Sequence, residues 1–212
     1  DLVQVLDMTS AGDVAALIAE PVQGVGGFAT PPDGFFGAMG KVLDSRDILF
    51  ISDEVQTGWG RTGEHFWGYE AHGIEPDMLT FAKGVGTGIT LAGVVARAEI
   101  MDSIDVTSFS TFGGNPLSAA GGLATLRYVL DNDLQANAKA MGARFHDALA
   151  PVVGDTPWIA EFRGRGLMWA LEICHPGTYE PDPKRTAALL EACKARGLLV
   201  GKGGLYGNII RI

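Results

Sequence analysis

Residues 49–88, LFISDEVQTGWGRTGEHFWGYEAHGIEPDMLTFAKGVGTG, contain two short apolar runs that each lead into a charged side chain. The first run ends at Asp53-Glu54, and the second is followed by Lys83. Apolar runs without polar alternation are typical of strands covered on both faces, and crossover-length segments between them indicate a mostly parallel sheet. Because ligands bind at the carboxyl edge of such a sheet, we expect Asp53 and Lys83 to belong to one site there.

The bulk composition limits the class of protein. The 212 residues are 47% hydrophobic and 19% charged, which is typical of a folded chain. The net charge of −9 disfavours nucleic acid or an anionic membrane as partner. An apolar run of about 18 residues is absent, as is a leader pattern, so we expect neither a membrane span nor a signal peptide. Cys174 and Cys193 lack metal-type spacing, which favours a reducing, cytoplasmic compartment.

The first 150 residues are expected to form an α/β region. The pattern predicts strands over residues 13–22, 48–51, 78–82 and 91–96. A helix over residues 34–46 should bury Phe35, Met39 and Val42. Asn115 should cap a helix that begins at Pro116. A further helix from about residue 134 should carry an apolar stripe that comprises Leu134, Ala138, Met141, Phe145 and Leu149.

The pattern changes near residue 151, where we place a domain boundary. WIAEF and LMWALEI alternate like half-buried antiparallel strands, and the turn RGRG between them should carry Arg163 and Arg165 outward. We expect a helix over residues 185–196, stopped by Gly197, and short strands at LLV and NIIRI.

Two charged groups at the sheet edge fit a pyridoxal phosphate site. A carboxylate at position 53 would favour the protonated pyridine ring and make it a better electron sink. Lys83 follows Phe81-Ala82, and a lysine in a partly apolar pocket loses its proton readily and can form a Schiff base. The alternatives are a capping or solvated acidic pair and an ordinary surface lysine.

Other candidate residues remain open to two interpretations. Ser110 and Thr111 precede the expected helix start and could seat a phosphate, or they could belong to an ordinary capping turn. Arg211 in a short apolar strand needs an anion, which could be a protein carboxylate or a substrate carboxylate. The four histidines have neither ligand spacing nor a Ser or Cys partner, so we expect no metal site and no hydrolase triad.

Four motifs, in this order and spacing, closely resemble those of the class-III pyridoxal phosphate aminotransferases: EPVQGVGG, ISDEVQTGWGRTG, TFAKGVGTG and STFGGNP. HFWGYEAHGIEPD is most similar to the alanine–glyoxylate and ω-amino acid:pyruvate branch. The resemblance implies a fold type I enzyme that is a homodimer with shared active sites. Residues 1–150 would be the C-terminal part of the large, mostly parallel α/β domain, and residues 151–212 part of a small α+β domain.

The resemblance also implies roles for individual residues. Lys83 would form the Schiff base and move the proton, and Asp53 would bind the pyridine nitrogen. Arg211 would grip a substrate carboxylate. The remaining cofactor contacts would be Val55 on the ring face, Gln56 at the ring hydroxyl, Thr111 beside Ser110 at the phosphate of the neighbouring subunit, and Glu20 in the EP motif.

Position 25 departs from part of the family. Ornithine- and 4-aminobutyrate-type members have a glutamate there that pairs with the substrate arginine, whereas this chain has Val25. We therefore expect alanine, β-alanine or a similar ω-amino acid as donor, with pyruvate or glyoxylate as acceptor. A 4-aminobutyrate- or ornithine-type aminotransferase and a pyridoxal phosphate racemase or aminomutase are the alternatives.

The N-terminal half of the family has no counterpart in these residues. That half supplies the first phosphate loop and an aromatic side chain that stacks on the cofactor ring. We therefore expect residues 1–212 to be a catalytically incomplete segment that acts only with this half. The alternative that is not an enzyme is a non-catalytic interaction module.

Overall fold

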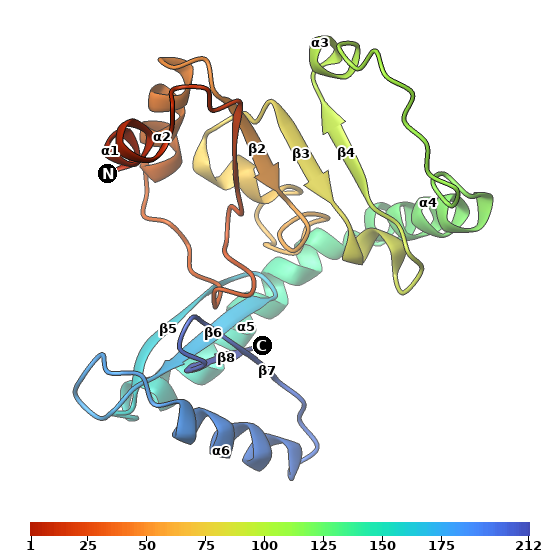
Figure 1. Cartoon of the computed structure of the whole chain (residues 1–212). Helices are drawn as coiled ribbons and strands as arrows, with labels where there is room; N and C mark the ends of the chain where they lie inside the picture. Colours follow the sequence, from red (N-terminus) through yellow and green to blue (C-terminus); the bar gives the residue numbers. More distant parts are fainter. The chain divides into compact units, whose positions relative to one another are not determined.

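The computed structural model describes all 212 residues, which form two compact units (Figure 1). The first unit comprises residues 1–21, 31–59 and 65–133, and the second comprises residues 22–30, 60–64 and 134–212. The last change of unit thus falls at Leu134, whereas the sequence placed the boundary near residue 151. Residue 151 lies inside helix α5 (Leu134–Gly154), whose final turn accommodates Pro151.

The first unit is built on a mixed, mostly parallel sheet, as the sequence predicted. Its strand order is β1 (Ala16–Ala19), β2 (Leu49–Asp53), β3 (Met78–Phe81) and β4 (Gly93–Ala96). The first three strands are parallel, and β4 pairs antiparallel with β3. The parallel strands therefore all end at one edge of the sheet.

Helix α2 (Phe35–Asp44) packs its apolar face into the core of this unit. The buried residues are Phe36, Met39 and Leu43, while Phe35 is 48% exposed. The predicted face of Phe35, Met39 and Val42 was therefore wrong at Phe35, while Val42 is half-buried. Two adjacent phenylalanines fit either face by period alone, and contact with Ile48 and Phe50 decides between them. Helix α1 (Leu2–Thr9) adds partly buried leucines to the same cluster.

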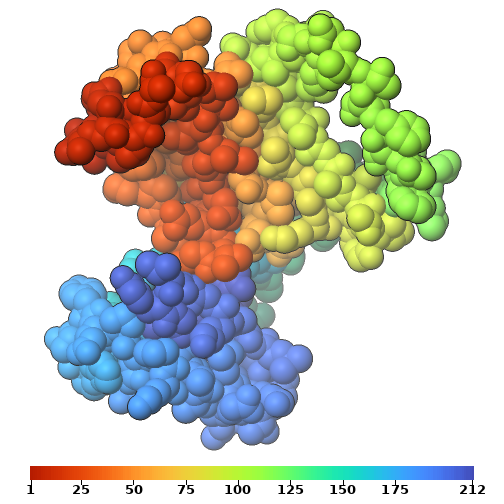
Figure 2. All heavy atoms as spheres, viewed as in Figure 1, coloured from red at the N-terminus to blue at the C-terminus, as the bar shows by residue number.

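The remaining elements of the first unit follow the sheet. They are the short 3₁₀ helices η1 (Gly68–His72) and η2 (Lys83–Gly86), α3 (Ala98–Met101) and α4 (Pro116–Asp131). Asn115 is the N-cap of α4 and Pro116 is its first residue, as predicted. Residues 102–114 are all exposed and arch away from β4, and an opening separates the two in the space-filling view (Figures 1 and 2).

The second unit is an antiparallel sheet with order β5 (Ile159–Arg165), β6 (Met168–Ile173), β8 (Ile209–Arg211) and β7 (Gly201–Gly203). The predicted hairpin is confirmed, but Arg163 and Arg165 lie in β5 and not in an outward turn. LLV was wrongly predicted as a strand, because β7 begins only at Gly201.

The two faces of this sheet are covered differently. Helices α5 and α6 (Pro183–Lys194) cover one face, where Leu171, Ile173 and Ile210 form a core. Residues 22–30 cover the other face, where Val22 and Phe28 join the apolar side chains of β6 and β8. Alternation along β8 explains this arrangement, since Ile210 faces the helices while Ile209 faces the loop.

The apolar stripe of α5 is only partly as predicted. The fully buried positions are Ala138 and Gly142, whereas Met141 is 39% exposed. Gly142 must be glycine, because a Cβ there would lie 2.2 Å from the Gly166 carbonyl oxygen. Such a backbone approach leaves no apolar residue for a sequence pattern to detect.

Both cysteines are free thiols. Burial is the main cause that raises the pKa of Cys174, and the charge of Glu172 adds to it. The structure contains no helix with both the length and the apolar character that a bilayer span requires.

Helix α6 should depend on pH through its cap. The Arg185 N–H donates to Asp182 Oδ1 at 2.9 Å, and this hydrogen bond is the main cause that lowers the pKa of Asp182 below its ordinary value of 3.8. The cap therefore stabilises the fold fully above that ordinary value and is lost as pH falls through the lowered pKa. Asp182→Ala should reduce the free energy of unfolding at pH 7, and its difference from the wild type should shrink in acid.

Urea unfolding at a series of pH values measures this difference. Asp182→Asn is the control, because it keeps a capping oxygen and removes the titration. A deficit of Asp182→Ala that stayed constant from neutral pH into strong acid would contradict the assignment.

Candidate active site at the carboxyl end of β2 and β3

The two charged residues singled out from the sequence follow neighbouring parallel strands. Asp53 is the last residue of β2, and its register partner on β3 is Thr80. Lys83 is the first residue of η2, just past the end of β3. The Glu54 N–H donates to the Thr80 carbonyl at 2.9 Å, which extends the pairing of the strands to this edge. Both residues thus leave the sheet at its carboxyl edge.

The Asp53 carboxylate is fixed by its own turn. The Val55 N–H donates to Asp53 Oδ1 at 3.0 Å, and the residue is half-buried. Oδ2 takes part in no hydrogen bond of the structure, so one oxygen is held while the other can accept from a ligand. This arrangement suits a carboxylate that must face a single N–H group.

Lys83 has a backbone conformation that the sequence did not reveal. Its φ is +46°, in the left-handed region, which is uncommon for a residue with a Cβ. Such a conformation costs about 1–3 kcal/mol and is found preferentially at functional sites. The side chain is exposed, so the partly apolar pocket expected from the sequence is not formed around it within this chain, and its amine makes no ion pair or hydrogen bond within the chain.

Glu54, the other acid of the pair, is a structural residue that the sequence analysis did not separate from Asp53. Its side chain is 0% exposed. Ser52 Oγ and the Tyr69 N–H donate to Oε1 at 3.1 and 2.9 Å, and Thr57 Oγ1 and the Gly68 N–H donate to Oε2 at 2.5 and 2.8 Å. Strand alternation could have indicated it, because residues 53 and 54 must point to opposite sides.

Three further residues predicted to contact the cofactor follow the ends of β1 and β2. Val55 and Gln56 follow Asp53 directly and are half-buried. Ala19 pairs with Ser52, so Glu20 emerges from β1 at the same edge as Asp53. Glu20, Val55 and Gln56 therefore all follow the ends of strands, at the same edge of the sheet as Asp53.

Ser110 and Thr111 lie on the exposed arch before α4. The Gly113 N–H donates to Ser110 Oγ at 3.1 Å, and the Ser118 N–H donates to Asn115 Oδ1 at 2.9 Å. The side chain that caps α4 is therefore that of Asn115, and not that of Ser110 or Thr111. Ser110 and Thr111 remain exposed and available for another contact.

Arg211 belongs to the second unit, on β8. Its Nη1 donates to the Gly24 carbonyl at 3.3 Å, its guanidinium lies 5.7 Å from the centre of the Phe28 ring, and its buried Nε has no hydrogen-bond partner. The sequence left two possible anions for Arg211, a protein carboxylate and a substrate carboxylate. The structure pairs Arg211 with no carboxylate of the chain.

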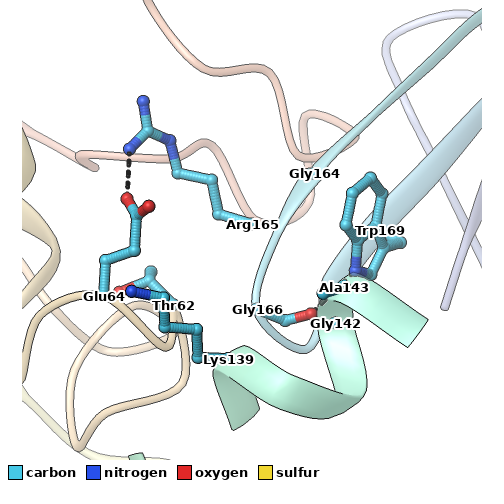
Figure 3. Close-up of a pocket in the computed structure, with 9 residues that line it drawn as sticks. All are labelled: Thr62, Glu64, Lys139, Gly142, Ala143, Gly164, Arg165, Gly166 and Trp169. Atoms are coloured by element: carbon cyan, nitrogen blue, oxygen red, sulfur yellow. Dashed lines mark hydrogen bonds and ion pairs between the residues drawn. The ribbon is translucent and has the colours of Figure 1, made fainter. Parts of the chain in front are cut away.

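A separate pocket of the second unit, of about 480 Å³, is lined by none of the predicted cofactor- or substrate-binding residues. Arg165 and Glu64 pair across it at 3.3 Å, and the indole N–H of Trp169 donates to the Gly166 carbonyl at 2.7 Å (Figure 3). These polar groups bind one another, so we do not assign the pocket a ligand.

Two residues at the carboxyl edge offer groups that pyridoxal phosphate can use, an acceptor for its ring N–H and an amine for its aldehyde. The Asp53 carboxylate retains one oxygen for a ring N–H, and the Lys83 amine is not engaged by the protein. Gly84 and Gly86 follow the lysine and present no side chains to a ring. The chemistry of these groups therefore fits the cofactor inferred from the sequence.

Comparisons with known proteins identify the family of the chain. A family model described as aminotransferase class-III matches residues 1–212. A 4-aminobutyrate aminotransferase of Mycobacterium leprae is 41% identical over 95% of the chain and 45% of its own length. The mitochondrial alanine–glyoxylate aminotransferase 2 homolog 2 of Arabidopsis thaliana is 38% identical over 100% of the chain and 45% of its own length.

Solved structures give the same result. A PLP-bound amine transaminase from an uncultivated Pseudomonas species is 35% identical, with a TM-score of 0.90, and the match covers 100% of this chain and 50% of that one. The chain belongs to the class-III aminotransferases, a family that depends on pyridoxal phosphate. It spans about half the length of the relatives that it matches.

The Glu54 hydrogen bonds should stabilise the first unit strongly. Glu54→Gln places an NH₂ group against N–H and O–H donors, and should lower the free energy of unfolding by about 2–3 kcal/mol. Glu75→Gln is the matched control on an exposed glutamate nearby and should change it by no more than about 0.5 kcal/mol. Urea unfolding followed by tryptophan fluorescence measures both, and equal effects would contradict the assignment.

Proposed function

We propose that the protein is a pyridoxal phosphate-dependent transaminase that uses Lys83 and Asp53. The observation that carries this proposal is the exit of both residues from adjacent parallel strands at one sheet edge, in a chain that matches the class-III family throughout. On this proposal, residues 1–150 contribute to the large domain and residues 151–212 to the small one.

The proposal gives each residue a defined role. Bound pyridoxal phosphate would supply an electron sink for the negative charge that develops on the substrate carbon. Asp53 Oδ2 would accept from the ring N–H, which would keep the ring protonated. Lys83 Nζ would hold the aldehyde carbon of the cofactor and, after the amino group of the donor has displaced it, would take a proton from the substrate carbon as general base. Val55 would pack on the ring face, Gln56 would meet the ring hydroxyl, and Glu20 would lie near the cofactor.

The substrate assignment follows from Arg211 and Val25. Arg211 would bind the carboxylate of the donor, since a guanidinium pairs well with a carboxylate. Val25 has no charge and is 65% exposed, so it cannot serve as a substitute carboxylate between half-reactions. We therefore propose alanine, β-alanine or a similar ω-amino acid as donor, and pyruvate or glyoxylate as acceptor.

A homodimer is the assembly that we propose, in the cytoplasm. The exposed arch contains Val106, Phe109 and Phe112, which are 72%, 85% and 82% exposed. Apolar side chains at such exposure favour burial against another surface. In a dimer this arch would bring Ser110 and Thr111 to the cofactor phosphate of the neighbouring subunit.

The first test is spectroscopic and uses the full-length protein. Wild-type protein with pyridoxal phosphate should show the visible absorbance band of lysine-bound cofactor, and an amino donor should bleach it. Lys83→Ala should lack the band and lose at least about 10³-fold in kcat, because it removes both the carbonyl partner and the base. A donor-sensitive band retained in Lys83→Ala would remove Lys83 from this role.

Product analysis separates transamination from the rival reactions on the same cofactor. A transaminase releases a keto acid or aldehyde from the donor and transfers the amine to pyruvate or glyoxylate. A racemase or aminomutase would return an amino acid without keto acid. Detection of isomerised amino acid alone would overturn the proposal.

Residues 1–212 expressed by themselves should bind cofactor incompletely. Titration with pyridoxal phosphate, followed at the visible band, should give less than stoichiometric binding, because the proposed site also needs groups from outside these residues. Tight, stoichiometric binding by this segment alone would contradict that expectation.

A further inference from the structure

Arg211 is held loosely for an arginine that is not fully exposed. A guanidinium has five N–H donors, and here the structure supplies one hydrogen bond, at 3.3 Å, together with the Phe28 ring. Its Nε is buried without a partner. The position of the guanidinium must therefore be set mainly by the shape of the surface on which it lies.

That surface is the bare backbone of β7. Gly203 pairs with Ile209, and Gly201 pairs with Arg211 itself, so both glycines lie beside the arginine in the sheet. Neither has a positive φ, so backbone conformation does not require glycine at these positions. The reason for glycine must be sought in the space that a side chain would take.

The two glycines differ sharply in that space. A Cβ on Gly203 would lie 2.8 Å from Arg211 Cδ, 2.9 Å from Arg211 Nε and 2.8 Å from the Val25 carbonyl oxygen. A Cβ on Gly201 would lie 3.6 Å or more from any atom of Arg211, which is ordinary van der Waals contact. Only position 203 excludes a side chain.

The arginine would yield to such a side chain before the loop does. The Val25 carbonyl is held by the Gly204 N–H at 2.9 Å, and the same loop is held by Arg163 Nε, which donates to the Gly27 carbonyl at 3.0 Å. The Arg211 side chain has only its one long hydrogen bond to lose. A methyl group at position 203 would therefore displace the Arg211 side chain, and its contact with the Val25 carbonyl would in addition require a shift of the loop or of β7.

We propose that Gly203 is a specificity-determining residue, which positions Arg211 for the carboxylate of the amino donor by having no side chain. This inference rests on the proposed role of Arg211 in binding that carboxylate. Gly203 itself touches no substrate and acts only through the arginine. Its effect should therefore appear in donors with a carboxylate and not in simple amines.

Steady-state kinetics of the full-length enzyme test the proposal, with β-alanine and a simple alkylamine as donors. Gly203→Ala should raise KM for β-alanine about tenfold, equivalent to about 1.4 kcal/mol of binding. It should leave kcat, the visible cofactor band and KM for the alkylamine unchanged. Gly201→Ala is the matched control on the same strand and should change each value less than about twofold.

A double-mutant cycle keeps the test valid if Gly203→Ala folds poorly. In an Arg211→Ala background the clash with Cδ and Nε is absent, so Gly203→Ala should cause no further loss of β-alanine affinity. An additional tenfold loss in that background, or equal effects of Gly203→Ala and Gly201→Ala, would overturn the inference.

A binding measurement separates this inference from the proposed activity. Calorimetric titration of the cofactor-free full-length protein with propionate should show saturable binding that Arg211→Ala abolishes and Gly203→Ala weakens about tenfold. If propionate binds in this way but no donor yields keto acid, transamination fails and the role of Gly203 stands. If the wild type binds no propionate, or if Gly203→Ala binds it as the wild type does, the role of Gly203 fails.

Discussion

The candidate site depends on the buried carboxylate of Glu54. Burial of an unpaired carboxylate would be prohibitive, and four donors around this one remove the penalty. Two of these donors are the backbone N–H groups of Gly68 and Tyr69, which are 14 and 15 residues away along the chain. The bonds therefore fix the end of β2 and the start of η1 together. Asp53 points to the opposite side of the strand and makes none of these four hydrogen bonds. Its position is fixed by them, because they hold the strand end that carries it.

Local signals in the sequence were sufficient for the parallel strands and for the helix cap at Asn115. They predicted Asp53 and Lys83 at one sheet edge, because strand ends follow from apolar runs and carboxyl ends of parallel strands coincide. They could not choose between Phe35 and Phe36 for the buried face of α2. That choice depends on the shape of the sheet, which is a tertiary property.

Features made by backbone alone were not predictable. The left-handed φ of Lys83 and the close approach of Gly142 to Gly166 have no side-chain signature. The space beside Gly203 is of the same kind, since a glycine in the sequence indicates a turn as readily as a contact. The change of compact unit at Leu134 was not predictable for a related reason. Loop signals near Pro151 lie on the last turn of α5, and helix geometry overrides them.

Arg211 is distinguished by its surroundings from the other half-buried arginines. The chain has four arginines of intermediate exposure, and Arg163, Arg165 and Arg185 each pair with a carboxylate of the chain. Arg211 has none, although acidic residues outnumber basic ones by 25 to 16. Partly buried guanidinium groups are rarely left without an anion. In a protein so rich in carboxylates, an arginine that meets only a carbonyl, an aromatic ring and two glycines is placed to receive its anion from outside the chain.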